Sequence, residues 1–494
     1  MSSPSTSQPR TGGVRAWIDR RTGLDRLMRA ALDEPVPGGA RFAYVFGSGL
    51  LFLFVSQVIT GLCLALYYVP SAESAHTTVA FIAKKVTGGE FIRSIHVYGA
   101  SAMIVVLALH LLQTVTYGAY KRRRELLWLS GIVLASLVLA MAFTGYLLPW
   151  DERAYFATSV GTNIMGEIPF IGNAVERFMR GGDVLGTLTL SRFYFAHILL
   201  IPGLIFAFIA THVFLFRKAG AAGPVSVTSE AAAKSLPAQP FYPRQVIYDM
   251  AFAGIVIVAL FLLADLYPAG LGRMADPSNT QFLPRPEWYF LPMFQWLKVW
   301  ESHPIVGIFV VPGILATLFA LLPFLDRRPE RRPWRRPVAV GSVFIVLLGG
   351  IFLGALSKYQ DNHTASVREQ LQIQDQQAAD FMKAPFQPQM SAGAAAIAAA
   401  ASQSKTAAAA ANNPAVAAGL KLYQSKGCIA CHGPNGSGTP IAIALAKVAQ
   451  TTPAATIRHD LQHYTPLMKS KGMPPFTFTN TELDDLVSYI TSLK

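Results

Sequence analysis

Four histidines lie inside long apolar stretches of the sequence, where few partners exist for a polar ring. His96 and His110 are 14 residues apart, and His197 and His212 are 15 residues apart. At about 100° per residue, each pair returns to one helix face within about 40° and 60°, and the helical rise separates its members by roughly 21 to 22 Å. Two facing helices of this kind would present two histidine pairs at two depths of a bilayer core of about 30 Å.

Iron ligation is the simplest chemistry for four such histidines, because haem iron occupies one ring nitrogen and leaves the other free to donate. A lone histidine would sooner be a polar residue that bridges helices. We therefore predict two non-covalent b haems. Four glycines repeat the 14-residue spacing and would let a flat macrocycle approach, although small residues also serve plain helix packing: Gly47, Gly61, Gly131 and Gly145.

A second group of ligating residues lies near the C-terminus, in the run Cys428-Ile429-Ala430-Cys431-His432. In a CxxCH motif the two thiols form thioethers with haem and the histidine binds iron, which predicts one covalent c haem. A zinc site is the alternative, but no second cysteine pair exists to complete it. Met473 is the predicted sixth ligand, with Met468 and His463 as rivals. The remaining cysteine, Cys63, is interpreted as a small core residue.

The elements that position these residues are expected to be membrane helices. The composition is 52% hydrophobic and only 14% charged, which is typical of a polytopic membrane protein. Seven stretches approach the ~20 apolar residues needed to cross a bilayer: 43–69, 94–118, 128–149, 192–216, 248–268, 304–325 and 338–357. Residues 150–190 and 269–303 are mixed in polarity and predict short surface helices. The predicted fold class is all-α.

The charge distribution predicts the orientation of these spans. The net charge is +14, and its densest clusters, Lys121 to Arg124 and six arginines between Arg327 and Arg336, lie beside apolar spans. The positive-inside rule places such loops in the cytoplasm, so we expect a cytoplasmic N-terminus, an extracytoplasmic C-terminus and no nucleic-acid partner. Residues 1–40 lack the pattern of a secretory signal, so we expect the first span to direct insertion.

The sequence divides into five expected segments. Residues 1–40 form a cytoplasmic N-terminal segment, 41–220 a four-helix di-haem bundle, and 221–360 a part with three further helices. Residues 361–413 are interpreted as an Ala-rich linker, because 391–411 has low complexity and no apolar stripe. Residues 414–494 would form a small extracytoplasmic domain that ends in a helix over 481–493.

Spans one to four resemble cytochrome b of the cytochrome bc and bf complexes. The matching text includes Arg93-Ser94-Ile95-His96, Gly145-Tyr146-Leu147-Leu148-Pro149-Trp150-Asp151 and Arg192-Phe193-Tyr194. The resemblance implies that His96 with His197 holds an outer haem and that His110 with His212 holds an inner one. It also implies haem propionate contacts for Arg93 and Arg192, and a place near an inner quinone site for Arg217.

The 15-residue interval between the histidines of span four resembles the bf type. Spans five to seven resemble the separate small subunit of that type, here fused in one chain. Val45 stands where the bf type has a cysteine that attaches an extra haem, so the resemblance does not extend to a further covalent haem.

Pro286-Glu287-Trp288-Tyr289 matches the quinol-oxidation motif of the same family. Oxidising a quinol removes two protons with two electrons, and a carboxylate at the boundary of water and lipid can accept one proton. Glu287 is the predicted base, and Tyr289 would shape the pocket. A loop-ordering hydrogen bond is the alternative role of Glu287, but the match extends from Ala275-Asp276-Pro277 through Phe290.

These features together predict a quinol:cytochrome c oxidoreductase subunit in a bacterial-type inner membrane. The resemblance implies a separate Rieske iron–sulfur protein, a soluble cytochrome or terminal oxidase as acceptor, contact with membrane lipid, and a dimer of complexes. One alternative is a di-haem membrane anchor that relays electrons for a dehydrogenase. Another is a haem-binding sensor or scaffold without turnover.

Overall fold

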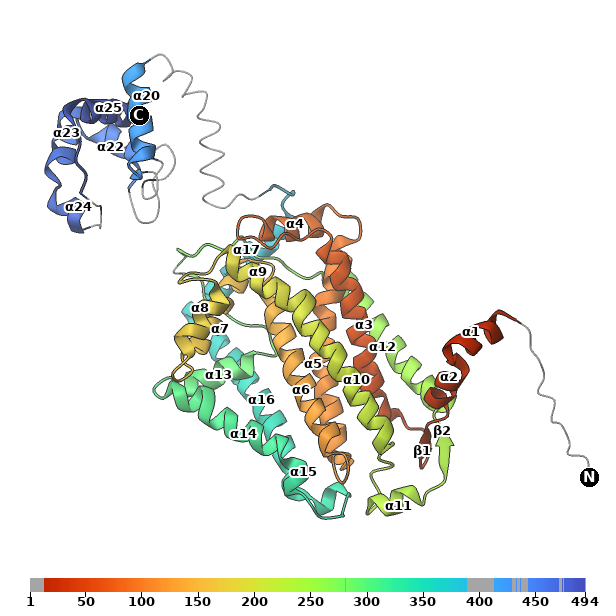
Figure 1. Ribbon diagram of the computed structural model, residues 1–494. Coiled ribbons are helices and arrows are strands. Elements are labelled where there is room, and N and C mark those ends of the chain that lie inside the picture. The colour runs from red at the N-terminus through yellow and green to blue at the C-terminus, as the bar shows by residue number, and fades with distance from the viewer. Residues whose placement is uncertain are drawn as a thin grey trace, which may run out of the picture. The chain divides into compact units, whose positions relative to one another are not determined.

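The computed structural model describes residues 13–279, 281–388, 413–428, 432, 436, 443–470, 473 and 475–493. Two compact units are present, one within residues 1–275 and 281–387, and one containing residues 388–494 with 276–280. Each unit is described by itself (Figure 1).

The first unit is a bundle of long helices. Its N-terminal half contains α1 (Val14–Thr22), α2 (Leu24–Leu32), η1 (Phe42–Tyr44), α3 (Val45–Ala65), α4 (Ala75–Lys84), α5 (Gly89–Thr116), α6 (Glu125–Tyr146), α7 (Glu152–Gly166), α8 (Gly172–Arg180), α9 (Thr187–Phe195), η2 (Ala196–Leu200) and α10 (Ile201–Ala219). Helix α3 packs on α5, and α6 packs on α10 (Figure 1). These pairs bring the histidine-bearing helices α5 and α10 into one bundle.

The C-terminal half of this unit surrounds that bundle. It contains α11 (Glu230–Lys234), α12 (Arg244–Leu266), α13 (Leu291–Val299), η3 (Val306–Val310), α14 (Val311–Ala320), α15 (Leu322–Leu325), η4 (Pro333–Arg335), α16 (Pro337–His363) and α17 (Ala365–Lys383). Helix α12 packs on α5 and α3, and α13 packs on α16. Strand β1 (Pro35–Pro37) pairs antiparallel with β2 (Ala238–Pro240), with Val36 opposite Gln239.

Within the part of the chain that the structure describes, six helices are long and apolar enough to cross a membrane: Phe42–Ala65, Gly89–Thr116, Glu125–Tyr146, Thr187–Ala219, Arg244–Leu266 and Pro337–His363. Only 6% to 22% of their most apolar windows is buried inside the chain. Apolar surface exposed on this scale is unfavourable in water and suits lipid. The chain is therefore a multi-pass membrane protein.

The sixth predicted stretch, 304–325, is divided in the structure. The π-turn η3 precedes α14, and α15 follows it after Leu321, so the continuous apolar helix covers only Val306–Ala320. Pro312 and Pro323 stand in the first turns of α14 and α15. Proline lacks a backbone N–H and restricts the residue before it, which accounts for the irregular π-turn before Pro312 and for the break at Leu321 before Pro323.

The core of the bundle separates two depths of the membrane. It includes Met103 and Val106 of α5, which lie between His96 and His110, together with Leu53, Phe54, Val138, Ile201, Ile205 and Leu260. Apolar side chains therefore fill the space between the two histidine levels.

The predicted linker 361–413 begins inside α16 and includes α17, while residues 389–412 lie outside the described residues. In α17 the less exposed positions recur at helical spacing: Val367, Gln370, Leu371, Gln374, Gln377, Ala378, Phe381 and Met382. Phe381 and Met382 pack near Val79 and Ala80 of α4, and Lys84 donates to the carbonyls of Phe381 and Ala384. This helix is thus docked on the bundle.

The second unit is a small helical domain with α20 (Pro414–Ser425), α22 (Leu445–Thr451), α23 (Ala454–His463), α24 (Pro466–Ser470) and α25 (Asn480–Ser492). The predicted closing helix is confirmed as α25, which buries Leu483, Leu486 and Ile490. A Cβ at Gly419 of α20 would lie 2.0 Å from the Asp485 carbonyl oxygen. Glycine therefore allows α20 and α25 to pack closely.

Candidate functional site

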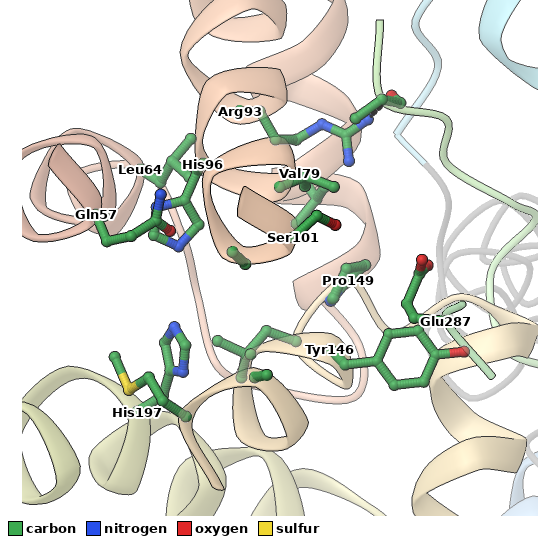
Figure 2. A pocket seen from close by; sticks show the side chains of 18 of the residues that line it. Gln57, Leu64, Val79, Arg93, His96, Ser101, Tyr146, Pro149, His197 and Glu287 are labelled. Atoms are coloured by element: carbon green, nitrogen blue, oxygen red, sulfur yellow. Dashed lines mark hydrogen bonds between the residues drawn. The ribbon is translucent and has the colours of Figure 1, made fainter. Parts of the chain in front are cut away.

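His96 and His197, the pair expected to hold the outer haem, face a shared cavity. His96 of α5 and His197 of η2 have ring centroids 6.3 Å apart and planes at 76°. Both rings line a cavity of about 640 Å³, and Figure 2 places them on opposite sides of its open space. The separation is about that of two imidazoles sharing one metal at ordinary His–metal distances of about 2 Å. The pair therefore fits a bis-histidine haem, which would supply a one-electron carrier.

Hydroxyl groups fix the tautomers of these two rings. Nδ1 of His96 lies 2.9 Å from Oγ1 of Thr60, and that hydroxyl donates its own proton to the Ser56 carbonyl at 2.8 Å. Because the hydroxyl proton is committed, Nδ1 must be the donor and Nε2 keeps its lone pair. Thr144 acts in the same way: its hydroxyl donates to Ala140 at 2.9 Å and lies 3.1 Å from Nδ1 of His197.

The inner pair repeats this arrangement with one difference. Ser130 lies 2.9 Å from Nδ1 of His212, and its hydroxyl donates to the Leu127 carbonyl at 2.8 Å. Nδ1 of His110 is buried and has no hydrogen-bond partner among the described residues. Three of the four rings thus present a metal-ready Nε2, and the fourth is set by packing alone.

Each of the four predicted glycines lies against one of the histidines. A Cβ added at Gly61 would lie 3.1 Å from Cε1 of His96, and one added at Gly145 would lie 2.5 Å from Cε1 of His197. A Cβ added at Gly47 would lie 3.5 Å from Cε1 of His110, and one added at Gly131 would lie 3.2 Å from Cε1 of His212. Helix α3 therefore supports the histidines of α5, and α6 supports those of η2 and α10. The absence of a Cβ matters most at Gly145, where any side chain would displace the ring.

Sequence reasoning missed the three hydroxyl residues, although the sequence contains a signal for them. Thr60, Ser130 and Thr144 each come directly before one of the spaced glycines, whereas Phe46 precedes Gly47. The residue before a glycine that faces a histidine can reach Nδ1 of that histidine ring. The pattern hydroxyl–glycine therefore distinguishes three histidines from the fourth.

The quinol motif lies partly in the same cavity as the outer histidines. Glu287 and Tyr289 line it, together with Tyr146 of α6 and Arg153 of α7, and Figure 2 places Glu287 and Tyr146 together. Pro286 and Trp288 are not among the lining residues. Trp288 instead donates from Nε1 to the Ser101 hydroxyl at 3.2 Å. The structure therefore brings half of the tetrapeptide to the cavity.

Arg153 connects Glu287 to α17. Its guanidinium lies 3.8 Å from the Glu287 carboxylate and 3.9 Å from that of Asp375. The Glu287 side chain is 32% exposed, which gives a carboxylate contact with both the cavity and water. Burial, and secondarily the charge of Glu287, raise the pKa of Tyr289. Its phenol therefore stays protonated and can donate a hydrogen bond.

Helix α17 forms part of the cavity wall through Gln374, Gln377 and Ala378. The Gln374 amide accepts from the backbone N–H of Leu283 at 2.8 Å and donates to the Leu283 carbonyl at 3.1 Å. Leu283 stands three residues before Pro286, so this clamp holds the start of the quinol loop. A second support is the ion pair of Arg285 with Asp361, at 2.8 Å.

The three predicted arginines lie in different surroundings. Arg93 is buried at the cavity, donates to the carbonyls of Ala269 and Gly270, and has an Nε without a partner among the described residues. Arg192 donates to the Phe178 carbonyl and is not among the lining residues. Arg217 lies 3.4 Å from Glu34. The structure thus brings Arg93 to the cavity of the outer pair and leaves the other two outside it.

In the second unit, His432 lies with its Nδ1 2.9 Å from the Ile443 carbonyl oxygen. A carbonyl only accepts, so Nδ1 donates and Nε2 is available for a metal. Cys428 packs against the core of this domain, while Cys431 lies outside the described residues. The structure gives these residues the surroundings of a small folded domain, with His432 in a ligating tautomer.

Around Met473, the main chain is fixed by two hydrogen bonds. Its carbonyl accepts from the Tyr464 hydroxyl at 2.5 Å, and its N–H donates to the Met468 carbonyl at 3.0 Å. The rival His463 stacks on His459 at 4.2 Å. The Met473 backbone is therefore held between two other residues of the same loop region.

The fold defines a mostly helical, multi-pass membrane protein with histidines at two levels of its helix bundle, and the same chain carries a small helical domain. Three family models match it: "Cytochrome b/b6/petB" over residues 31–220, "Cytochrome b(C-terminal)/b6/petD" over 274–373 and "Cytochrome c" over 416–494. The chain belongs to the cytochrome b family of cytochrome bc complexes and carries a cytochrome c domain. This membership implies haem b and haem c.

Individual relatives agree with the family models. Cytochrome b of Cereibacter sphaeroides is 32% identical over 371 residues, which are 70% of this chain and 82% of that protein. A cytochrome bc complex cytochrome b subunit of Chlorobaculum thiosulfatiphilum is 37% identical over 322 residues, 64% and 74% of the two chains. Cytochrome b/c1 of Bradyrhizobium diazoefficiens is 32% identical over 72% of this chain and 52% of its own.

A solved structure also resembles the fold. A chain of a hyperthermophilic respiratory Complex III superposes with a TM-score of 0.62 at 28% identity, over 76% of this chain and 98% of that chain. The resemblance thus includes the arrangement of the helices as well as the sequence.

Proposed function

We propose that the chain is the cytochrome b and c subunit of a quinol:cytochrome c oxidoreductase, and that it oxidises a membrane quinol beside Glu287. One observation carries the proposal: a single cavity of about 640 Å³ is lined by Glu287 and Tyr289 as well as by His96 and His197. A proton acceptor and the ligands of an electron acceptor thus share one space, which a quinol oxidation requires.

The chemistry divides between two side chains. Oxidation of a quinol to a quinone releases two protons and two electrons, and the Glu287 carboxylate would take one proton from a quinol hydroxyl as general base. Arg153 forms an ion pair with this carboxylate at 3.8 Å and would hold it in place before the transfer. Tyr289, whose pKa is raised by burial, keeps its proton and would donate a hydrogen bond to the other quinol oxygen. The second quinol proton would leave from that oxygen to the separate iron–sulfur protein that takes one of the two electrons.

The electrons would leave along two routes. His96 with His197 and His110 with His212 would hold two b haems, whose one-electron chemistry would connect the quinol cavity with an inner quinone site. The other electron would go to a separate Rieske protein and then to a c haem held by Cys428, Cys431, His432 and Met473. The complex III name of the solved relative and the presence of only three cysteines in this sequence support a separate Rieske chain.

The surroundings of the complex follow from the same proposal. A soluble cytochrome or terminal oxidase would accept electrons from the c domain, membrane lipid would cover the apolar helix faces, and two complexes would form a dimer. Arg93 would meet a haem propionate through its unpaired Nε. Arg192 and Arg217 are proposed for the outer propionates and the inner quinone only by resemblance.

We also propose seven membrane crossings, with the interrupted segment η3–α14–α15 as the sixth. The N-terminus and the loops with Lys121 to Arg124 and Arg327 to Arg336 would be cytoplasmic, and the c domain would lie outside a bacterial inner membrane. The segments remain those predicted from the sequence: 1–40, 41–220, 221–360, 361–413 and 414–494.

Replacement of Glu287 by Gln tests the proposal. Glu287→Gln keeps the size of the side chain and removes the base, so quinol:cytochrome c activity in membranes should fall by about 10²-fold. Glu301→Gln, at an exposed position of the following segment, is the matched control and should retain activity. Haem content should be equal in all three chains, because no iron ligand changes. Full activity of Glu287→Gln at equal haem content would favour the di-haem anchor instead.

A further inference from the structure

Four cations are buried together at one end of the bundle, where the α5–α6 loop meets the segment before α16. Lys121, Arg124, Arg331 and Arg336 are each only 2% to 5% exposed. This burial is unexpected, because the sequence suggests a solvated basic loop. Buried cations need partners, so their hydrogen bonds are informative.

Three of these cations form ion pairs with two carboxylates. Lys121 lies 2.7 Å from Asp326, and Arg336 lies 3.7 Å from the same residue. Arg124 lies 2.5 Å from Glu230. The nearby Glu330 is occupied by the side chain of Arg332, at 2.8 Å. Four buried cations therefore face two carboxylates, which leaves an excess of two positive charges, and one of the four cations has no carboxylate partner among the described residues.

That side chain is Arg331, which makes no ion pair among the described residues. Its Nη2 donates to the Tyr117 carbonyl at 3.0 Å. Its Nε and Nη1 are buried without a hydrogen-bond partner. Burial, followed by the charge of Arg124, lowers the pKa of Arg331 to about 10. A guanidinium that is 98% buried with two unused donors is costly unless an acceptor is present.

Tyr44 adds a third unused donor at the same place. Its hydroxyl is buried and makes no hydrogen bond that satisfies ordinary geometry. Its ring contacts that of Tyr117 edge-on, with centroids 5.8 Å apart, and it interacts electrostatically with Arg331. Tyr117 thus contacts both residues: its carbonyl accepts a hydrogen bond from Arg331, and its ring packs against the ring of Tyr44.

The position of these donors relates them to the inner histidines. Tyr117 follows His110 by seven residues, about two helical turns, and Tyr44 precedes Gly47, the glycine that faces His110, by three. Both therefore lie beyond His110, toward the end of the bundle that holds the basic loops. None of the arginines predicted from the sequence as haem contacts lies in this group.

We propose that Arg331 and Tyr44 form a binding site for an oxyanion, a carboxylate or a phosphate, at the inner end of the bundle. A free N–H of the Arg331 guanidinium can donate a charge-assisted hydrogen bond to one oxygen of such a group, and the tyrosine hydroxyl can donate to another. The net excess of two positive charges in the cluster attracts an anion. Its source is either a propionate of a haem bound by His110 and His212 or the headgroup of a phospholipid.

The test uses the purified complex with Arg331→Gln and Tyr44→Phe, and with Arg335→Gln as the control. Arg335 belongs to the same basic run and is exposed. Two quantities are measured: the redox titration of each b haem, and the phospholipid phosphorus retained per chain after detergent exchange. Tyr44→Phe keeps the ring contact with Tyr117, so it decides the outcome if Arg331→Gln fails to assemble.

If the bound anion is a haem propionate, Arg331→Gln should lower the ferrous-to-ferric ratio of one b haem by about tenfold at fixed potential, because a positive charge that favours the reduced form is lost. Tyr44→Phe should shift it less. If the bound anion is a phospholipid headgroup, the haem titrations of the site variants should be unchanged and about one phosphorus per chain should be lost. Arg335→Gln should change neither. Unchanged titrations and unchanged phosphorus in both site variants would overturn the proposal.

The haem outcome rests on the proposed haem ligation by His110 and His212, and the lipid outcome does not. If the wild-type complex lacks a second b haem, the proposed function fails at that step while the phosphorus measurement still decides the anion site. If the variants keep their full haem content and show neither a shifted haem titration nor a loss of phosphorus, the proposed function stands and the proposed anion site is wrong.

Discussion

At the scale of single residues, the histidine tautomers are set by hydroxyls whose own protons are committed to helix carbonyls. Thr144 illustrates the arrangement, because its Oγ1 lies 2.9 Å from the Ala140 carbonyl oxygen and 3.1 Å from Nδ1 of His197. Such partners of a metal-binding histidine fix its ring orientation and raise its basicity. Loss of the hydroxyl should therefore weaken metal binding by the histidine, although the histidine itself is unchanged.

Thr144→Val preserves the shape of the side chain and removes the acceptor of the His197 Nδ1 proton. We expect haem affinity at the outer pair to fall by about 10- to 100-fold, and the outer b-haem absorbance to shift or weaken while the inner one is unchanged. Reduced-minus-oxidised spectra of membranes measure both haems. Ser136→Ala, which removes a hydroxyl from an exposed position of the same helix, is the control. Identical spectra for Thr144→Val and wild type would contradict the role of the hydroxyl.

At the scale of elements, α17 turns part of a predicted linker into a wall of the outer cavity. Its inward face carries glutamines where a packed helix would carry apolar residues, and one of them, Gln374, holds both backbone groups of Leu283. The helix therefore positions the quinol loop through the main chain.

Gln374→Leu should loosen that loop by removing both hydrogen bonds at nearly constant volume. We expect the KM for quinol to rise several-fold, with kcat reduced less, because Glu287 itself is unchanged. Gln372→Leu, on the exposed face of the same helix, should leave both constants at wild-type values. Steady-state kinetics with a soluble quinol analogue measures them. Equal kinetics in the two variants would mean that α17 does not position the loop.

The helices that carry the histidines were predictable, because long apolar stretches and a 14-residue spacing specify them. The close approach of the His197 ring to the His96 ring was not predictable from the spacing. A 15-residue interval leaves its partner about 60° out of line on a regular helix, but η2 is a π-turn, which takes up about one extra residue. Helix α17 was missed because Gln370, Gln374 and Gln377 interrupt the apolar positions of its inward face. The burial of Arg331 and Arg336 was missed because charge runs ordinarily face solvent.

At the scale of the whole molecule, the chain combines a membrane unit and a separate helical unit, and each has its own core. The covalent haem is proposed for the second unit alone. Haem that survives denaturation therefore reports on one unit and haem that is extracted reports on the other.

The double variant Cys428→Ser/Cys431→Ser should remove all haem peroxidase stain from the full-length band on a denaturing gel. The b-haem spectrum of undenatured membranes should persist, because His96, His110, His197 and His212 lie in the other unit. Cys63→Ser is the control and should keep the stain. Stain that remained on the double variant would reveal a further covalent attachment and refute the interpretation of Val45.

The committed hydroxyl protons also bear on how the empty protein would acquire its prosthetic groups. Metal binding usually requires a ligand to shed a proton or exchange tautomers. His96, His197 and His212 already hold their protons on Nδ1, so uptake at His96 and His197 would need no proton transfer. No hydrogen bond among the described residues fixes the tautomer of His110, so one of the two levels is prepared for ligation by hydrogen bonds at both histidines and the other at only one.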